Sequence, residues 1–315
     1  MSSRSETLDP DLAALRDQVR AAGAAPLVAL TPDEARERVS GGDVACDGGP
    51  VVREVEDLTI GDAPGVRIRS YDNGASHSTL VYAHGGGWVT GDLQYADELC
   101  RHLAATASLR VVSVDYRLAP EHPFPAAVDD IDAAVEWAMA LALANGDPVF
   151  VGGDSAGGNL AATAAQRHPG IAGLVAIYPV VDHDPTRPSY RDHAQGFPIG
   201  ASDMAWFFDH YAPPEARTDP RISPLRTIRD DHPPTYLLTA GHEPLCDEGF
   251  AYAEELAERG VLVEHRHEPT LCHGFLRSSR ISSGVRAARD RLVADIARFV
   301  ALDRSSSAAD PQSRA

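Results

Sequence analysis

The sequence predicts an α/β fold in which a central, mostly parallel sheet of eight strands is flanked by helices and carries a helical cap. Two observations predict it. From the third apolar run onward, short strand-like runs alternate with helical patterns, as in sheets that are covered on both faces. One long segment between Pro179 and Pro234, rich in Pro, Asp and aromatic residues, interrupts this alternation, and segments of that length are usually functional.

The first 45 residues are expected to be mainly helical. One helical pattern covers Asp9 to Ala22 and a second covers Thr31 to Ser40, with Thr31 suited to the N-cap and Pro32 to the first helical position. We assign residues 1–45 to an N-terminal helical cap segment, because these helices could form a lid together with the long interruption.

The remaining elements follow from hydrophobic periodicity. The expected strands, of which the first two are closely spaced and form an antiparallel edge, are Val52–Ile60, Gly65–Tyr71, Thr79–Ala83, Arg110–Asp115, Val149–Gly152, Ala172–Tyr178, Thr235–Ala240 and Val261–His267. The expected helices between and after them are Leu93–Thr106, Pro125–Ala144, Ser155–His168, Asp247–Arg259 and Ser279–Ala301.

These elements predict one large domain with an insertion. We assign residues 46–302 to this domain, with a cap insertion at about residues 180–232 that contains a short amphipathic helix, Ser202 to Tyr211. Residues 303–315 are small and polar, and we expect them to form a disordered tail.

The charge balance excludes several classes of function. All 28 basic residues are Arg, and 46 Asp and Glu give a net charge of −18, which disfavours nucleic-acid partners. The absence of Lys excludes Schiff-base and pyridoxal-phosphate enzymes, P-loop NTPases and protein kinases.

The N-terminal residues Met1 to Pro10 lack an apolar signal core, and no run reaches membrane-spanning length. We therefore expect a cytoplasmic protein without membrane insertion.

The strongest chemical signal is the run Gly153-Asp154-Ser155-Ala156-Gly157, which follows a predicted strand and begins a helix. This is the G-x-S-x-G motif in the context that it requires, a sharp turn with small residues on either side of the serine. The turn exposes the Ser155 hydroxyl at the carboxyl edge of the sheet, so we expect Ser155 to be a nucleophile.

A second signal is His84-Gly85-Gly86-Gly87-Trp88, directly after the third strand. Glycine leaves backbone N–H groups unobstructed, so two from Gly85, Gly86 and Gly87 could bind a substrate oxyanion together with the N–H of Ala156. His84 is interpreted as a structural histidine that holds this loop.

With these motifs in order, the chain resembles the bacterial hormone-sensitive-lipase-like carboxylesterases over roughly Val52 to Val300. The other matching pieces are Asp115 to Glu121, Phe124 to Ala127, Asp219 to Pro224 and His273 to Phe275. The resemblance implies an α/β-hydrolase fold with a helical cap, short-chain acyl esters as substrates, and no metal or cofactor. Family members often dimerise, so the resemblance is compatible with a homodimer.

The resemblance also implies that an acid and a histidine follow the serine in sequence. His273 lies in a loop after the last predicted strand, from which a base can reach the nucleophile. The family usually has Asp-Pro-Leu at the acid, whereas this chain has Glu243-Pro244-Leu245-Cys246-Asp247. The register of this run places Glu243 at the position of the acid, and a glutamate can also hold an imidazole tautomer. Asp247 is the alternative acid and would otherwise be the N-cap of the next helix.

Other polar residues near these motifs are interpreted as structural. Asp154 is expected to point away from Ser155, and Arg117, near Asp115, to brace loops by ion pairing. The run Asp182 to Thr186 mimics the D-x-D-x-T of aspartate-nucleophile phosphatases but is better explained as the start of the cap. The cysteines Cys246 and Cys272 flank the two catalytic loops; buried thiols are favoured, with a regulatory disulfide as the alternative.

Together these residues predict a serine carboxylester hydrolase that acts on short- to medium-chain acyl esters through an acyl-enzyme intermediate. The alternatives are an amidase, lactonase or acyltransferase with the same triad, or a non-catalytic small-ligand receptor of the same fold. Aromatic residues that could line the substrate pocket, or merely pack the cap onto the core, are Trp88, Trp206, Phe207, Phe208, Tyr211 and Phe275.

Overall fold

The computed structural model describes residues 6–41, 45–74 and 76–308. The strands of this part of the chain are β1 (Glu54–Ile60), β2 (Val66–Asp72), β3 (Thr79–Ala83), β4 (Arg110–Asp115), β5 (Val149–Asp154), β6 (Gly173–Ile177), β7 (Thr235–His242) and β8 (Val263–Cys272). They form one eight-stranded sheet in the order β1-β2-β4-β3-β5-β6-β7-β8. The predicted fold class is therefore confirmed.

The sheet is parallel except at one edge. Strand β1 pairs antiparallel with β2, as the short spacing between the two predicted, and β2 is also antiparallel to β4. Strand β3 lies between β4 and β5 and is parallel to both. Because the chain leaves β3 for β4 on one side and returns to β5 on the other, the loops after β3 and β5 are neighbours at the carboxyl edge. Ligands of such sheets bind at this kind of switch point.

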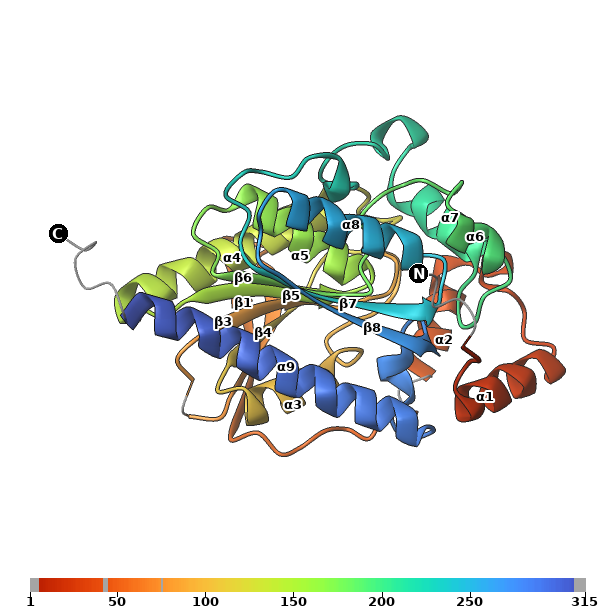
Figure 1. Ribbon diagram of the computed structural model, residues 1–315, viewed down its shortest axis with the longest axis horizontal. Helices are drawn as coiled ribbons and strands as arrows, with labels where there is room; N and C mark the ends of the chain where they lie inside the picture. Colours follow the sequence, from red (N-terminus) through yellow and green to blue (C-terminus); the bar gives the residue numbers. More distant parts are fainter. Residues whose placement is uncertain (1–5, 42–44, 75, 309–315) are drawn as a thin grey trace.

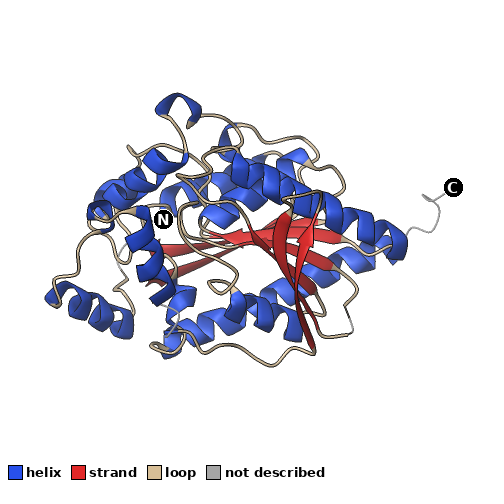
Figure 2. Cartoon of the chain, turned by 180° about the vertical axis from the view of Figure 1, so that it is seen from behind, coloured by secondary structure: helices blue, strands red, loops and turns tan. Residues whose placement is uncertain are grey.

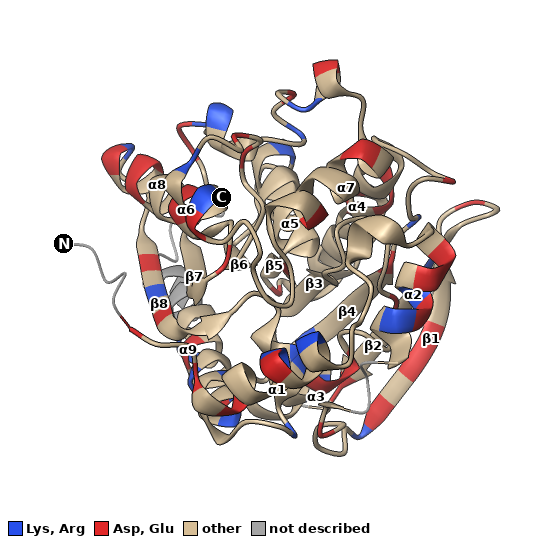
Figure 3. Cartoon of the chain, turned by 90° about the vertical axis from the view of Figure 1, so that its right-hand side faces the viewer, with Lys and Arg blue, Asp and Glu red and all other residues tan. Residues whose placement is uncertain are grey.

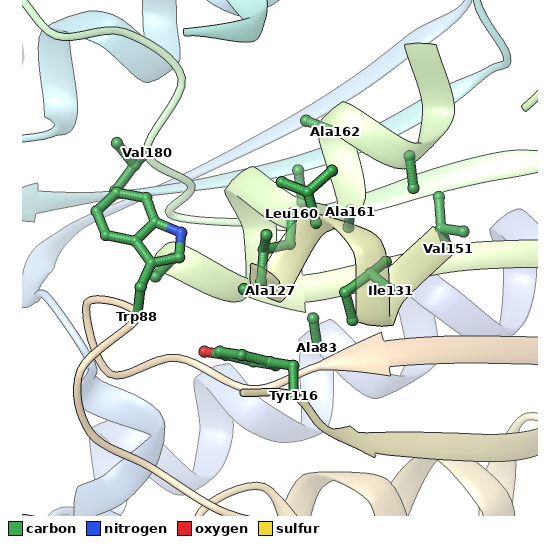
Figure 4. Close-up of a cluster of buried hydrophobic side chains, with 14 of the residues drawn as sticks. Ala83, Trp88, Tyr116, Ala127, Ile131, Val151, Leu160, Ala161, Ala162 and Val180 are labelled. Atoms are coloured by element: carbon green, nitrogen blue, oxygen red, sulfur yellow. The ribbon is translucent and has the colours of Figure 1, made fainter. Parts of the chain in front are cut away.

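Helices cover both faces of the sheet. Helices α3 (Asp97–Thr106) and α9 (Ser283–Ala308) lie on one face, and α4 (Ala126–Asn145), α5 (Ala156–Arg167) and α8 (Cys246–Glu258) lie on the other, as Figures 1 and 2 show. Each face has its own apolar cluster. Figure 4 shows Ala83 of β3, Val151 of β5 and Leu160 of α5 in one of them, with Ala127 and Ile131 of α4 among them. This packing fixes β3, β5 and α5 relative to one another.

The other helices gather at the carboxyl edge of the parallel strands (Figure 1). They are α1 (Pro10–Ala21), α2 (Pro32–Gly41), α6 (Pro188–Asp192) and α7 (Ala201–Tyr211). The chain also has the 3-10 turns η1 (Leu27–Ala29), η3 (Pro214–Ala216), η4 (Pro224–Arg226) and η5 (Phe275–Ser278), of which η4 contacts α5 and α8. Helix α7 packs on η1, and the Arg20 guanidinium donates to the Gln195 carbonyl at 3.1 Å. The N-terminal segment and the insertion thus lie side by side.

The sequence signals at the start of α2 act as expected. The Thr31 hydroxyl accepts the Glu34 N–H at 3.3 Å, and the Glu34 carboxylate accepts the Thr31 N–H at 2.8 Å. This reciprocal pair is a capping box, and it satisfies two backbone donors that a helix terminus leaves without partners.

Three helix boundaries differ from the sequence prediction by four residues or more: the start of α3, and both ends of α9, which begins at Ser283 rather than Ser279. Helix α3 begins at Asp97 rather than Leu93, because the Asp92 carboxylate accepts the Tyr95 N–H at 2.9 Å and closes a turn before it. Helix α9 continues to Ala308, although we expected a tail from Asp303. No Gly or Pro interrupts the chain there, so the helix has no stop signal. The rest of the expected tail, 309–315, lies outside the described residues.

Over the residues that the structure covers, none of the helices combines the length and the apolar character that a membrane crossing requires.

Candidate active site

Ser155 occupies the sharp turn between β5 and α5. Its backbone has φ 57° and ψ −120°, a conformation that costs energy in a residue other than glycine and is held here by its surroundings. The Ser155 N–H donates to the Ile177 carbonyl at 2.9 Å, on the neighbouring strand. A Cβ atom at Gly153 would overlap the Gly157 backbone, and one at Gly157 would overlap the Ala83 carbonyl. The two glycines are therefore required by the close approach of the backbone at the turn.

Three side chains from separate loops meet at this turn. The His273 Nε2 lies 2.8 Å from the Ser155 Oγ, and the His273 Nδ1 makes a short hydrogen bond to the Glu243 Oε2. The other carboxylate oxygen of Glu243 accepts the Ala240 N–H at 3.0 Å. Glu243 is fully buried, and Ser155 and His273 are each 6% exposed. An imidazole between a hydroxyl and a carboxylate in this way can take the hydroxyl proton and remain stabilised as a cation.

Asp247, the alternative acid, lies elsewhere. Its carboxylate accepts the Ser189 N–H of α6 at 2.8 Å, and its own N–H donates to the Ser189 Oγ at 3.3 Å. The prediction that Asp247 is the N-cap of its own helix is wrong, since α8 begins at Cys246 with Leu245 in the cap position. Asp247 instead satisfies an N-terminal donor of α6, which joins the cap to the start of α8.

The glycine loop after β3 presents two backbone donors. No hydrogen bond from the Gly86 or Gly87 N–H is found among the described residues, whereas the Gly85 N–H donates to the Asp154 Oδ1 at 3.0 Å. The assignment of Gly85 as an oxyanion donor is therefore corrected, because its N–H is already used. Only glycine fits at position 86 of this loop, because a Cβ atom there would overlap the Thr90 carbonyl.

The side chains of Asp154 and His84 hold this loop in place through hydrogen bonds to Gly85. The Asp154 carboxylate also accepts the Tyr82 hydroxyl at 2.9 Å, and burial raises the pKa of Asp154 above its usual value. The His84 Nδ1 donates to the Gly85 carbonyl at 2.7 Å, and the ring stacks on Tyr116 at 4.3 Å between centroids. Burial lowers the pKa of His84 to about 4, so it is neutral at pH 7. Both side chains hold the loop and do not face the Ser155 hydroxyl.

A cavity of about 640 Å³, here called the Ser155 cavity, opens above these groups. Ser155, His273, Gly86 and Gly87 line it together with apolar side chains of the cap. The apolar residues that the sequence analysis did not single out come from α1, η1, α7 and the segment before α7, and include Leu15, Val19, Leu27, Phe197, Ile199 and Met204. No motif marks them; the signal in the sequence was the expectation that the N-terminal helices and the insertion form a lid together.

The predicted pocket residues divide into two groups. Phe207 and Phe275 line the Ser155 cavity. Trp88 and Tyr211 do not, because they stack on each other at 4.3 Å in the core and Trp88 also meets Phe208 at 5.3 Å. Trp206 packs on His210 at 4.2 Å on the other side of α7. Trp88 thus fastens the glycine loop to α7 through Tyr211 and Phe208, and none of Trp88, Trp206 and Tyr211 lines the cavity.

The remaining candidates are structural. Asp182 accepts hydrogen bonds from Arg187 at 3.0 Å and Arg226 at 2.8 Å, so the phosphatase-like run is part of an ion-pair network. Arg117 pairs with Asp130 at 2.8 Å, and Asp115 lies 3.4 Å from Arg67. All four cysteines fall in the described part of the chain, and no disulfide joins them. Nor do the residues placed by the structure include three or more His, Cys, Asp or Glu grouped to hold a metal ion.

Known proteins match the chain over most of its length. A family described as alpha/beta hydrolase fold matches residues 80–277. An ethyl acetate hydrolase of Pseudomonas putida is 37% identical over 298 residues, which cover 87% of this chain and 94% of that protein. The carboxylic ester hydrolase LipN of Mycobacterium tuberculosis is 38% identical over 265 residues, which cover 78% of this chain and 70% of LipN.

Solved structures agree with the sequence matches. An alpha/beta hydrolase enzyme from the metagenome of Lake Arreo, Spain, superposes with a TM-score of 0.86 at 35% identity, covering 93% of this chain and 98% of that chain. A hyperthermophilic esterase from the archaeon Pyrobaculum calidifontis superposes with a TM-score of 0.84 at 34% identity, covering 93% and 99%.

Proposed function

This chain belongs to the hormone-sensitive-lipase-like family of the alpha/beta hydrolase fold and is a carboxylesterase, a serine hydrolase, and from that premise we propose that it cleaves short- to medium-chain acyl esters with Ser155 as nucleophile. His273 is the general base in this proposal, and Glu243 is the acid that orients it. The Gly86, Gly87 and Ala156 N–H groups bind the oxyanion.

The reaction proceeds through two acyl transfers. In the first, the His273 Nε2 takes the Ser155 hydroxyl proton while Oγ attacks the ester carbonyl, and the oxyanion forms beside the Gly86 and Gly87 donors. His273 then protonates the leaving alcohol oxygen, and the C–O bond breaks to give the acyl-enzyme. In the second, water loses a proton to His273 and attacks the acyl carbon, which releases the acid and restores the Ser155 hydroxyl.

Glu243 acts through His273 and does not take up the proton. Its Oε2 accepts the Nδ1–H of the imidazole, which leaves Nε2 as the unprotonated nitrogen that faces Ser155. The Ala240 N–H on Oε1 fixes the other end of the carboxylate. The negative charge at Nδ1 stabilises the imidazolium that forms when the serine proton arrives.

The observation that carries the proposal is the 2.8 Å approach of His273 Nε2 to Ser155 Oγ at a cavity lined by Gly86 and Gly87, whose N–H groups make no hydrogen bond to any residue that the structure describes. The largely apolar cap walls and a volume of about 640 Å³ support short to medium acyl chains rather than long lipids. A relative that is an ethyl acetate hydrolase also supports a small ester. The ligand-receptor alternative is not retained, because His273 is present and in contact with Ser155.

The experiment is hydrolysis of p-nitrophenyl esters from acetate to laurate by the wild type, Ser155→Ala and the control Ser40→Ala, which alters an exposed serine of α2. We expect the highest kcat/KM among the short and medium esters, a loss of all measurable turnover in Ser155→Ala, and no change in Ser40→Ala. Equal turnover of laurate and butyrate would contradict the chain-length proposal, and residual wild-type activity in Ser155→Ala would contradict the nucleophile.

A further inference from the structure

The charged residues of the Ser155 cavity have the opposite balance to the chain as a whole. The chain has 46 Asp and Glu against 28 Arg. Apart from His273, the ionisable residues that line the cavity include three arginines, Arg20, Arg38 and Arg277, and one carboxylate, Asp203. In a strongly acidic protein, a cavity whose lining is net positive focuses an attractive field on anions that approach it.

Two of these arginines have no carboxylate within ion-pair distance in the part of the chain that the structure describes. Arg20 donates to the Gln195 carbonyl at 3.1 Å, and Arg38 donates to the Ala25 carbonyl at 2.8 Å. A guanidinium has five N–H donors, so each keeps donors for a further acceptor.

Their neighbours on the same two helices differ. Arg16 of α1 pairs with Asp17 at 2.8 Å, and Arg36 of α2 pairs with Glu121 at 2.6 Å. Neither of these two paired arginines lines the Ser155 cavity. Figure 3, which views the side of the molecule with α1 and α2, shows basic residues on both helices. On α1 and α2, the described arginines without an ion pair are therefore the two at the cavity.

The other two charged residues leave this balance in place. Arg277 donates to the Val39 carbonyl at 2.9 Å, and its guanidinium lies 4.1 Å from the Tyr95 ring centroid, so its charge is fixed in the wall. The Asp203 carboxylate accepts the Gly200 N–H at 2.8 Å at the start of α7. Burial raises the pKa of Asp203, whereas the Gly200 N–H and the Arg38 charge act in the opposite direction, so Asp203 counts as one negative charge against three arginines.

We propose that the preferred esters of this enzyme carry a carboxylate at the end that lies toward α1 and α2, where Arg20 and Arg38 bind it. This inference rests on the proposed function, because the ester carbonyl must still be placed between Ser155 and the Gly86 and Gly87 donors. A carboxylate accepts two parallel N–H bonds from one guanidinium, which also orients the substrate. A neutral ester of the same length gains only the contact with the apolar walls.

The test compares esters that differ only in the terminal charge. Monoethyl esters of dicarboxylic acids are compared with ethyl esters of fatty acids of the same carbon number, and ω-acetoxy carboxylates are compared with alkyl acetates of the same length. The first pair carries the anion on the acyl side and the second pair carries it on the alcohol side. The readout is the ratio of kcat/KM between the anionic and the neutral ester in each pair.

We expect the anionic ester to be preferred in at least one pair. The preference should fall about three-fold in Arg20→Gln and in Arg38→Gln, and about ten-fold in the double variant, chiefly through KM. Arg16→Gln, on α1 but outside the cavity, is the matched control and should leave the ratio unchanged, and Arg20→Lys should retain part of it. Raising the ionic strength from about 0.01 M to about 1 M shortens the Debye length from about 30 Å to about 3 Å and should reduce the preference.

The outcomes separate this inference from the proposed function. If the neutral short esters are hydrolysed but the anionic ones are no better in either pair, or Arg20→Gln and Arg38→Gln change both esters equally, the inference is wrong and the proposed function stands. Equal changes would mean that the arginines only hold the cap through Gln195 and Ala25. If no ester of either kind is hydrolysed by the wild type, the proposed function itself fails.

Discussion

Replacing Glu243 by Gln tests the acid, because the structure determines which way the new amide must face. The Ala240 N–H donates to the Glu243 Oε1 at 3.0 Å, so the amide oxygen of the introduced glutamine is drawn to this donor. The amide NH₂ then faces the His273 Nδ1 and donates to it. Turning the amide over would place two N–H donors against each other in a fully buried site.

This orientation selects the wrong tautomer of the histidine. With Nδ1 as acceptor, the imidazole proton moves to Nε2, which lies 2.8 Å from the Ser155 Oγ and can no longer accept the hydroxyl proton. Loss of the tautomer and of the negative charge lowers kcat by about 10⁴-fold in a serine triad. At about 1.36 kcal/mol for each factor of ten, this corresponds to about 5.4 kcal/mol of barrier.

The assay is steady-state hydrolysis of p-nitrophenyl butyrate, with circular dichroism and thermal unfolding to show that the variant is folded. Asp247→Asn is the matched control, because an asparagine Oδ1 can still accept the Ser189 N–H, and its kcat should stay within about two-fold of the wild type. A loss of less than ten-fold in Glu243→Gln, or a larger loss in Asp247→Asn, would refute this reasoning.

Three further predictions concern the loop, a buried carboxyl and the cap. In Gly87→Ala the new Cβ would overlap the Phe207 ring, and alanine is strained at φ 61°, so kcat should fall by about 100-fold as the loop donors are displaced; stopped-flow and steady-state rates measure this. Burial raises the pKa of Glu248 to about 8, so between about pH 4.5 and pH 8 the folded state keeps a proton on this carboxyl that the unfolded state has released. The contribution of the protonated Glu248 to the free energy of unfolding is therefore complete below about pH 4.5 and is lost as pH rises to about 8. Urea unfolding of Glu248→Gln should therefore show a smaller loss of stability between those pH values than the wild type, and parallel curves would contradict this. The Ser189 hydroxyl donates to the Pro244 carbonyl at 2.5 Å, beside the triad acid, so Ser189→Ala should lower both the melting temperature and kcat, with Ser189→Thr restoring part of each.

Local backbone chemistry explains which parts of the site could be predicted from sequence. Glycines on both sides of Ser155 are needed because a Cβ at either position meets backbone atoms, and the same is true of Gly86. Such requirements leave a fixed pattern in the sequence. The alternation of strands and helices likewise predicted the sheet and its antiparallel edge.

Contacts between distant segments explain what the sequence did not reveal. Whether Gly85 donates to a substrate or to Asp154 depends on the side chain that the neighbouring strand places beneath it. Trp88 stacks on Tyr211 of the cap, a residue far away in the sequence, so an aromatic run alone could not show which rings face the cavity. The walls formed by Leu27 and Met204 depend on how η1 meets α7.

The most direct test of the central claim is to trap the acyl-enzyme. The enzyme is mixed rapidly with p-nitrophenyl acetate, quenched in acid, and analysed by intact mass and by peptide mapping. We predict a burst of p-nitrophenol and one acetyl group per chain, located on the peptide that contains Ser155. Turnover without any acyl-enzyme, or an acetyl group on another residue, would contradict the account.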